Sequence, residues 1–267
     1  KQRLTLTVDN SASHSINIDA TTTKMHKSIN NIHSAVPVHE IEIDYTSSKS
    51  SNAHLEKIFI EVSTLLKIFQ QSNFIISDTE TKLVLDKYNI VLGIDKKMTN
   101  LDGRRSQSLE VQHVVDKLPN RYAVTDKADG ERYFLVIFDL KVYLISYNLE
   151  VKYTGHKLAD KLSKYNNTIL DGEYIYIESE NRHIFMAFDC LYTGTMDVRK
   201  LSSFTDRLKY ADEVIEKCFI AANHTDYKMK QYNGDFTINK IIDFHKKEMG
   251  EYLSALVKNI KIDKKML

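Results

Sequence analysis

The N-terminal part of the chain alternates polar and apolar residues, which is the pattern of β-strands. The alternation, rich in Thr, Val and Ile, runs through residues 3–9, 14–20 and 38–45, and a period of two is typical of strands with one buried face. The polar stretch over 21–34 predicts a loop. Because three strands cannot bury both faces of a sheet, we expect them to belong to a larger sheet.

A helical period follows these strands. Apolar side chains recur every three or four positions over 55–69, which predicts an amphipathic helix. A second helix is predicted from a Ser77 cap, with an acidic residue three positions later, to Gly93 just beyond its end. The polar stretch over 95–107 predicts an exposed loop, and a short helix is predicted over 109–118.

The rest of the chain returns to a period of two and then to a helical period. Strands and helices do not alternate strictly, so we predict an α+β fold, with mainly antiparallel sheets and flanking helices. The strands are predicted at 121–126, 132–139, 141–148, 168–178 and 183–192, and the helices at 204–219 and 236–260.

Composition narrows the class of protein. With 267 residues, 42% hydrophobic and 27% charged, the chain can bury the core of one large domain or two small ones. Its two cysteines exclude a disulfide scaffold and a cysteine-based zinc site. We find no apolar run long enough to span a membrane and expect no membrane partner. The net charge of +1 means that contact with nucleic acid requires a local basic surface.

The sequence KADGER over 127–132 is the strongest chemical signal. Lys127 ends a predicted strand, Asp129 and Gly130 form a turn, and Arg132 begins the next strand. A lysine amine becomes a nucleophile when desolvation or a neighbouring cation removes its proton, and Gly130 would let a phosphate approach the backbone. A solvated hairpin turn explains the same residues equally well.

Two further motifs bear on the choice between a nucleophilic lysine and a solvated hairpin turn. LDGEYIY places Asp171 and Glu173 at the start of a strand, where a carboxylate could hold a ribose hydroxyl or a divalent cation. MAFDCLY places Phe188 at a strand end, where it could stack on a base. Taken singly, an ordinary turn and a core phenylalanine are the commoner interpretations.

Together the three motifs resemble the covalent nucleotidyltransferase superfamily of mRNA capping guanylyltransferases, DNA ligases and RNA ligases, and their order and spacing match. The resemblance implies an ATP-grasp-like ligase and capping core in which Lys127 forms a covalent lysyl-GMP from GTP and passes GMP to a 5′-diphosphate RNA end. Arg132 would contact the ribose or the incoming 5′ end, Glu173 the ribose or a metal, and Phe188 the base. The implied nucleotide-binding residues are Asp129, Gly130, Arg132, Asp171, Glu173, Phe188 and Lys230, with Lys228 as the alternative to Lys230.

The chain looks most like the multifunctional capping enzymes of large cytoplasmic DNA viruses, of the mimivirus and African swine fever virus type. HEIEIDY, with Glu40, Glu42 and Asp44 on one strand face, resembles the acidic strand of tunnel-type RNA triphosphatases. A solvent-facing edge strand is the alternative. The resemblance implies Mg²⁺ or Mn²⁺ bound by Glu40, Glu42 or Glu173, the mRNA 5′ end as partner, a methyltransferase domain or subunit, and a place in the cytoplasmic viral factory or the virion.

This resemblance divides the chain into partial triphosphatase strands (1–50), a helical connector (51–107) and a guanylyltransferase nucleotide-binding domain (108–267). We find neither the family's motifs IV and V nor its OB domain, and therefore expect a truncated chain. Two rival hypotheses stay open. The chain could be the adenylation domain of an ATP-dependent DNA or RNA ligase, or a non-catalytic derivative that binds RNA or protein.

Overall fold

The chain folds into two compact units, residues 1–76 and 77–267. The computed structural model describes residues 1–11, 14–47, 52–95, 100–104, 122–125 and 127–236. The boundary between the units falls inside the segment 51–107 that we expect to be a connector. The helix predicted over 109–118, and all of that predicted over 236–260 except its first residue, lie outside the described residues.

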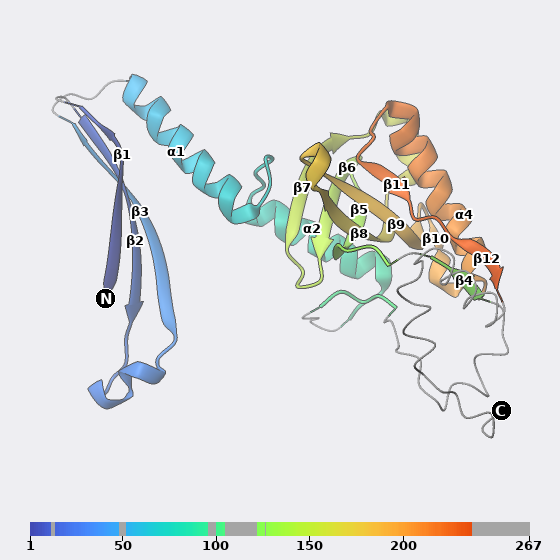
Figure 1. Ribbon diagram of the computed structural model, residues 1–267, viewed down its shortest axis with the longest axis horizontal. Coiled ribbons are helices and arrows are strands. Elements are labelled where there is room, and N and C mark those ends of the chain that lie inside the picture. The colour runs from blue at the N-terminus through green and yellow to red at the C-terminus, as the bar shows by residue number, and fades with distance from the viewer. Residues whose placement is uncertain (12–13, 48–51, 96–99, 105–121, 126, 237–267) are drawn as a thin grey trace, which may run out of the picture. The chain divides into compact units, whose positions relative to one another are not determined.

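The first unit is a three-stranded antiparallel sheet followed by a helix (Figure 1). Its elements are β1 (Gln2–Asn10), β2 (His14–Lys24), β3 (Pro37–Ser47) and α1 (Asn52–Gln70). The three strands and the helix are confirmed. The loop predicted from residue 21 was wrong at its start, because β2 continues to Lys24 in register with β3, and a 3₁₀ turn follows at Ile29–Ser34.

The second unit begins with helix α2 (Asp78–Leu92), whose predicted ends are confirmed. The Ser77 side chain accepts a hydrogen bond from the backbone N–H of Glu80, and Gly93 adopts a left-handed φ of 65°. The Glu80 carboxylate accepts hydrogen bonds from Lys141 and Tyr143, at 2.7 Å each. This carboxylate therefore fastens the helix to the neighbouring sheet.

A larger sheet forms the body of the second unit, in the order β10-β9-β8-β5-β6-β7, with β11 beside β9 (Figure 1). All its pairs are antiparallel except β11 with β9, which confirms the predicted α+β class. We did not predict β7, β10, β11 or β12. The strands of the larger sheet are β5 (Glu131–Phe138), β6 (Lys141–Ser146), β7 (Val151–Lys157), β8 (Thr168–Ile177), β9 (Arg182–Thr193), β10 (Met196–Asp197) and β11 (Tyr227–Met229). The remaining strands, β4 (Tyr122–Val124) and β12 (Asn233–Phe236), pair with each other in a separate two-stranded sheet.

The predicted helix over 204–219 is confirmed. It forms α4 (Phe204–Val214) and continues as a π-helical turn over Ile215–Phe219. Further 3₁₀ turns lie at Asp160–Tyr165, Glu178–Glu180, Val198–Lys200 and Ile220–Ala222. No helix in the described part of the chain is both long and apolar enough to cross a lipid bilayer.

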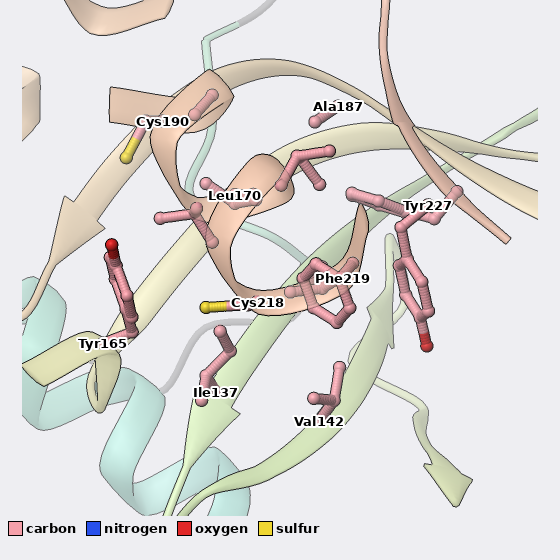
Figure 2. Packing of buried hydrophobic residues seen from close by; sticks show 14 of the residues in the cluster. Ile137, Val142, Tyr165, Leu170, Ala187, Cys190, Cys218, Phe219 and Tyr227 are labelled. Carbon is pink, nitrogen blue, oxygen red and sulfur yellow. The ribbon is translucent and has the colours of Figure 1, made fainter. Parts of the chain in front are cut away.

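One face of the larger sheet packs against α4 and the π-helical turn. Figure 2 shows Leu170, Ala187, Cys218 and Phe219 in this cluster, and all of them are buried. Burying a side chain the size of Phe219 stabilises the fold by about 2–3 kcal/mol. Because side chains alternate along a strand, residues that neighbour these core residues, such as Arg132 and Glu173, point to the opposite face, where the candidate site lies.

Candidate functional site

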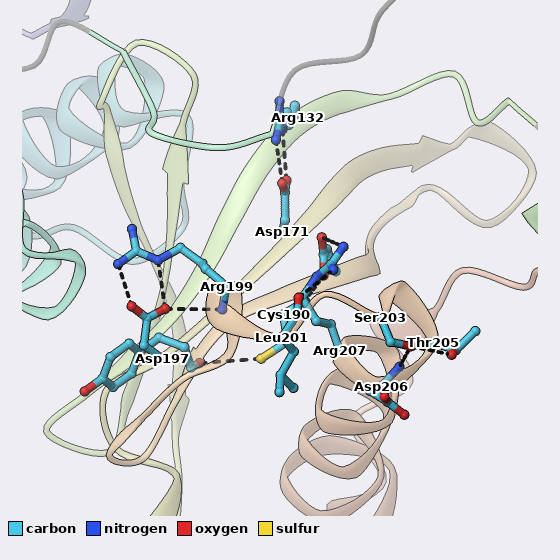
Figure 3. Close-up of polar contacts among 12 residues, drawn as sticks. Arg132, Asp171, Cys190, Asp197, Arg199, Leu201, Ser203, Thr205, Asp206 and Arg207 are labelled. Atoms are coloured by element: carbon cyan, nitrogen blue, oxygen red, sulfur yellow. Dashed lines mark hydrogen bonds and ion pairs between the residues drawn. The ribbon is translucent and has the colours of Figure 1, made fainter. Parts of the chain in front are cut away.

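An ion pair between Arg132 and Asp171 joins two of the predicted motifs (Figure 3). Arg132 lies on β5 and Asp171 on the adjacent strand β8. The guanidinium donates from Nε to Oδ1 at 2.9 Å and from Nη2 to Oδ2. Asp171 is only 1% exposed, and this burial raises its pKa to about 6 although Arg132 opposes the shift. The hydrogen bonds that Arg132 donates to Asp171 in turn raise the pKa of Arg132.

The geometry of this ion pair shows that Asp171 orients Arg132. Both of its carboxylate oxygens are used by the bidentate pair with Arg132. Asp171, which we expected among the nucleotide-binding residues, therefore holds Arg132 in place. The side chain of Arg132 keeps 26% of its surface exposed, so it is oriented and still accessible.

Phe188 lies between two cations. The Cζ atom of Arg132 is 5.9 Å from the Phe188 ring centroid, and the Nζ atom of Lys230 is 6.0 Å from it. Phe188 is also the extra residue of a β-bulge, because Gly172 pairs with Ala187 while the preceding residue Asp171 pairs with Asp189. The ring is half-buried, so part of its surface is open to a planar ligand.

Lys230 and Glu173 form a second pair on the same sheet. Their Nζ and Oε2 atoms are 3.4 Å apart, with 11% and 21% of the two side chains exposed. Lys230 reaches this position because β11 runs parallel to β9 and the Lys230 backbone N–H donates to the carbonyl oxygen of Ala187 at 2.7 Å. The other candidate, Lys228, is exposed and forms no ion pair within the described residues.

The segment that carries Lys127 is flanked by anchored residues on both sides. Before it, β4 pairs with β12, and Thr125 donates to the carbonyl oxygen of Gln231 at 2.7 Å. After it, a Cβ on Gly130 would lie 2.8 Å from the carbonyl oxygen of Tyr174, so only glycine allows this close approach to β8. Lys127 and Asp129 are both exposed.

Behind the site, Asp189 and Arg207 form another buried ion pair. Arg207 on α4 donates from Nε and Nη2 to the two carboxylate oxygens of Asp189, at 2.9 and 3.1 Å (Figure 3). Both side chains are less than a tenth exposed. In the sequence, the one sign of this pair is that Arg207 is the only arginine of the helix over 204–219. The ion pair of Arg207 with Asp189 links α4 to the segment of β9 that carries Phe188.

Sequence reasoning missed the approach of Gly103 to Arg132. Gly103 falls in the polar stretch 95–107, which we expected to be an exposed loop, and it is half-buried. A Cβ on Gly103 would lie 2.5 Å from Nη2 of Arg132. The sequence showed only a glycine in a polar loop at this position, and glycines are common in ordinary turns.

The predicted metal ligands all lie among the described residues, but they do not form a complete cation site. Among the described residues, no group of three or more His, Cys, Asp or Glu side chains is arranged to hold a metal. Glu40 and Glu42 are exposed on β3, where Glu42 is 3.2 Å from Arg3. Glu173 is a single carboxylate beside the cationic groups. A magnesium ion commonly binds one or two carboxylates together with substrate phosphates, so Glu173 fits a metal carried by a nucleotide.

Comparisons with known proteins identify the family of this chain. The family model of the mRNA capping enzyme catalytic domain matches residues 60–264. A probable mRNA-capping enzyme of Acanthamoeba polyphaga mimivirus is 34% identical over 197 residues, which cover 72% of this chain and 16% of that protein. The chain therefore spans about one sixth of the length of that relative. These matches confirm the resemblance drawn from the three motifs, and the chain belongs to the mRNA capping enzyme family, whose catalytic domain it carries.

Proposed function

We propose that the second unit is an mRNA guanylyltransferase that works through a covalent lysyl-GMP on Lys127. The observation that carries the proposal is the convergence of Arg132, Glu173, Phe188 and Lys230 on one face of the sheet. A charged rim around an aromatic ring suits a nucleotide, which has a flat base and an anionic triphosphate.

The reaction has two balanced steps. The deprotonated Nζ of Lys127 attacks the α-phosphorus of GTP and a P–N bond forms, with one amine proton lost to solvent. The bond to the bridging oxygen of the β-phosphate breaks to release pyrophosphate. A terminal phosphate oxygen of the 5′-diphosphate RNA then attacks the same phosphorus. The P–N bond breaks, and the nitrogen takes up a proton to regenerate the lysine amine.

The residues of the site have separable roles in these steps. Phe188 stacks on the base, while Arg132, held by Asp171, binds the ribose or the incoming 5′ end. Lys230 supplies positive charge near the base edge, which favours the O6 and N7 acceptors of guanine. Glu173 holds the ribose or shares a divalent cation with the triphosphate. When bound, Mg²⁺ or Mn²⁺ neutralises phosphate charge.

The test is the transfer of an α-phosphate label. Incubated with a divalent cation, the protein should become covalently labelled by GTP that carries its label at the α-phosphate, and should stay unlabelled when the label is at the γ-phosphate. Lys127→Ala should abolish the label. Lys209→Ala is the matched control, because Lys209 is a 76% exposed lysine on the outside of α4 and should label normally.

Three results would contradict the proposal. Normal labelling of Lys127→Ala would place the adduct elsewhere. Labelling by ATP but not by GTP would identify the ligase alternative. Absence of an adduct with either nucleotide would favour the non-catalytic alternative.

A second function is favoured by the polar face of the first unit. In the register of β2 and β3, Glu42 lies opposite Asp19 and Glu40 opposite Thr21. Arg3 lies 3.1 Å from Asp19 and 3.2 Å from Glu42. Carboxylates that share a face repel one another unless cations join them. We propose that this face contributes to an RNA 5′-triphosphatase that needs further ligands or substrate phosphates to hold its metal.

This second function is tested by phosphate release from RNA with a 5′-triphosphate. Glu40→Gln and Glu42→Gln should each lower the release rate by about tenfold or more, while leaving the adduct on Lys127 unchanged. Glu56→Gln, an exposed carboxylate on α1, is the matched control. Equal release rates in all three variants would remove Glu40 and Glu42 from the reaction.

A further inference from the structure

A short loop of the second unit, Leu101–Arg104, is anchored over the site face of the sheet. The backbone N–H of Leu101 donates to the carbonyl oxygen of Tyr147 at 3.1 Å. The backbone N–H of Asp102 donates to the hydroxyl of Tyr88 at 2.8 Å. Tyr88 lies in α2 and is fully buried, so the loop rests on a rigid support.

These anchors bring Gly103 against the guanidinium of Arg132. A Cβ on Gly103 would lie 2.5 Å from Nη2 of Arg132 and 2.8 Å from Cζ of Phe134, both closer than the 3.0 Å limit that real Cβ atoms respect. Phe134 is fully buried and has no space to retreat. Arg132 would have to move, and its bidentate bond to Asp171 would then be broken.

We propose that Gly103 is a positioning residue for Arg132. Because Gly103 has no side chain, the loop closes onto the guanidinium and confines it between Asp171, Phe134 and Phe188. An arginine side chain has several rotatable bonds, and confinement spares the nucleotide the entropy of ordering it. The effect on catalysis rests on the proposed function, whereas the effect on Arg132 itself does not.

The first experiment observes the arginine directly. In NMR spectra of the protein, the Nε–H groups of Arg132 and Arg207 should give protected signals, because each donates to a buried carboxylate at 2.9 Å. Arg132→Lys assigns the first signal. In Gly103→Ala the Arg132 signal should shift and exchange faster with solvent, whereas the Arg207 signal should stay unchanged as the internal control.

A second variant covers the case in which Gly103→Ala does not fold. Tyr88→Phe removes the hydroxyl that holds Asp102 and adds no bulk, so it should change the Arg132 signal in the same selective way but less strongly. An unchanged Arg132 signal in the folded Gly103→Ala protein, or in Tyr88→Phe when the former does not fold, would overturn the proposal.

The second experiment measures how adduct formation depends on nucleotide concentration. Gly103→Ala should raise the half-saturating GTP concentration about tenfold and change the plateau rate by less than about twofold. In an Arg132→Lys background the same substitution should add little, because residues that act through one another are non-additive. Equal effects in both backgrounds would overturn the proposal. If the wild-type protein forms no adduct, the proposed function fails while the NMR result still decides the role of Gly103.

Discussion

Asp171 shows how a single buried residue couples charge to position. It is almost fully enclosed, which disfavours its ionised form, yet Arg132 donates two hydrogen bonds to that form. Burial has the larger effect and raises the pKa from 3.8 to about 6. The orientation of Arg132 therefore depends on the protonation of a carboxyl group close to neutral pH.

This pKa predicts that nucleotide affinity falls as the pH drops below about 6, because a protonated Asp171 no longer offers Arg132 two charged acceptors. The half-saturating GTP concentration for adduct formation, measured across pH 5 to 8, should rise in acid. Asp171→Asn should bind weakly at every pH and lose this inflection. The same inflection in Asp171→Asn would show that another group titrates.

Protonation of Asp171 has the opposite effect on the stability of the fold from its effect on nucleotide affinity. Because the folded-state pKa of Asp171 lies above its ordinary value of 3.8, the native state binds this proton more tightly than the unfolded state does. The contribution of Asp171 to stability is therefore largest below pH 4 and falls as the pH rises to about 6. Acid should weaken nucleotide binding through this group without unfolding the protein through it.

Residue identity could be predicted better than residue role. Lys127, Arg132 and Phe188 could be singled out as candidates because their motifs are contiguous and ordered in the sequence. That Asp171 holds Arg132 could not be predicted, since the two residues are 39 positions apart and meet only through the register between β5 and β8. The approach of Gly103 to Arg132 has no local signature either.

At the scale of elements, the pair of Arg207 and Asp189 fastens α4 to β9. Removing one partner of a buried pair leaves the other charge uncompensated, so Arg207→Leu should lower the free energy of unfolding by about 3–5 kcal/mol. Urea denaturation measures this change. Lys209→Ala on the exposed side of α4 should shift stability by less than about 0.5 kcal/mol. A loss as small in Arg207→Leu as in Lys209→Ala would mean that the buried pair is dispensable.

Periodicity and caps predicted the long elements. The helix from Ser77 to Gly93 was identifiable because both of its ends carry local signals. Strand β7 was missed because it contains Gly155 and a mixture of polar residues. Strand β11 has three residues, and its parallel pairing with β9 is fixed only by distant contacts. Short strands of this kind carry too little periodicity to recognise.

At the scale of the whole molecule, the described residues of the candidate nucleotide site all belong to the unit that begins at Ser77. Ile16, 1% exposed, lies in the other unit. Ile16→Asp should unfold the three-stranded sheet, because it buries a charge without a partner, and should leave adduct formation within about twofold of wild type. The control is Leu4→Asp, at a 71% exposed position. A parallel loss of the adduct and the sheet would show that the units depend on each other.

The α+β class could be predicted from the sequence, since strands and helices occur without strict alternation. The position of the boundary between the units could not. Helices α1 and α2 look alike in their periodicity, yet they belong to different units. Long-range packing decided this, through contacts such as that of Glu80 with Lys141.

The β-bulge at Phe188 limits how this strand can evolve. A second register shift lies between Ile169 and Leu170, so Asp189 and Cys190 sit between two irregularities. Losing or gaining one residue here would exchange the sides on which the following side chains emerge. It would uncouple Asp189 from Arg207 and rotate Phe188 away from Arg132 and Lys230. Among functional descendants of this chain, substitutions between Met186 and Tyr192 should therefore be far commoner than changes in length.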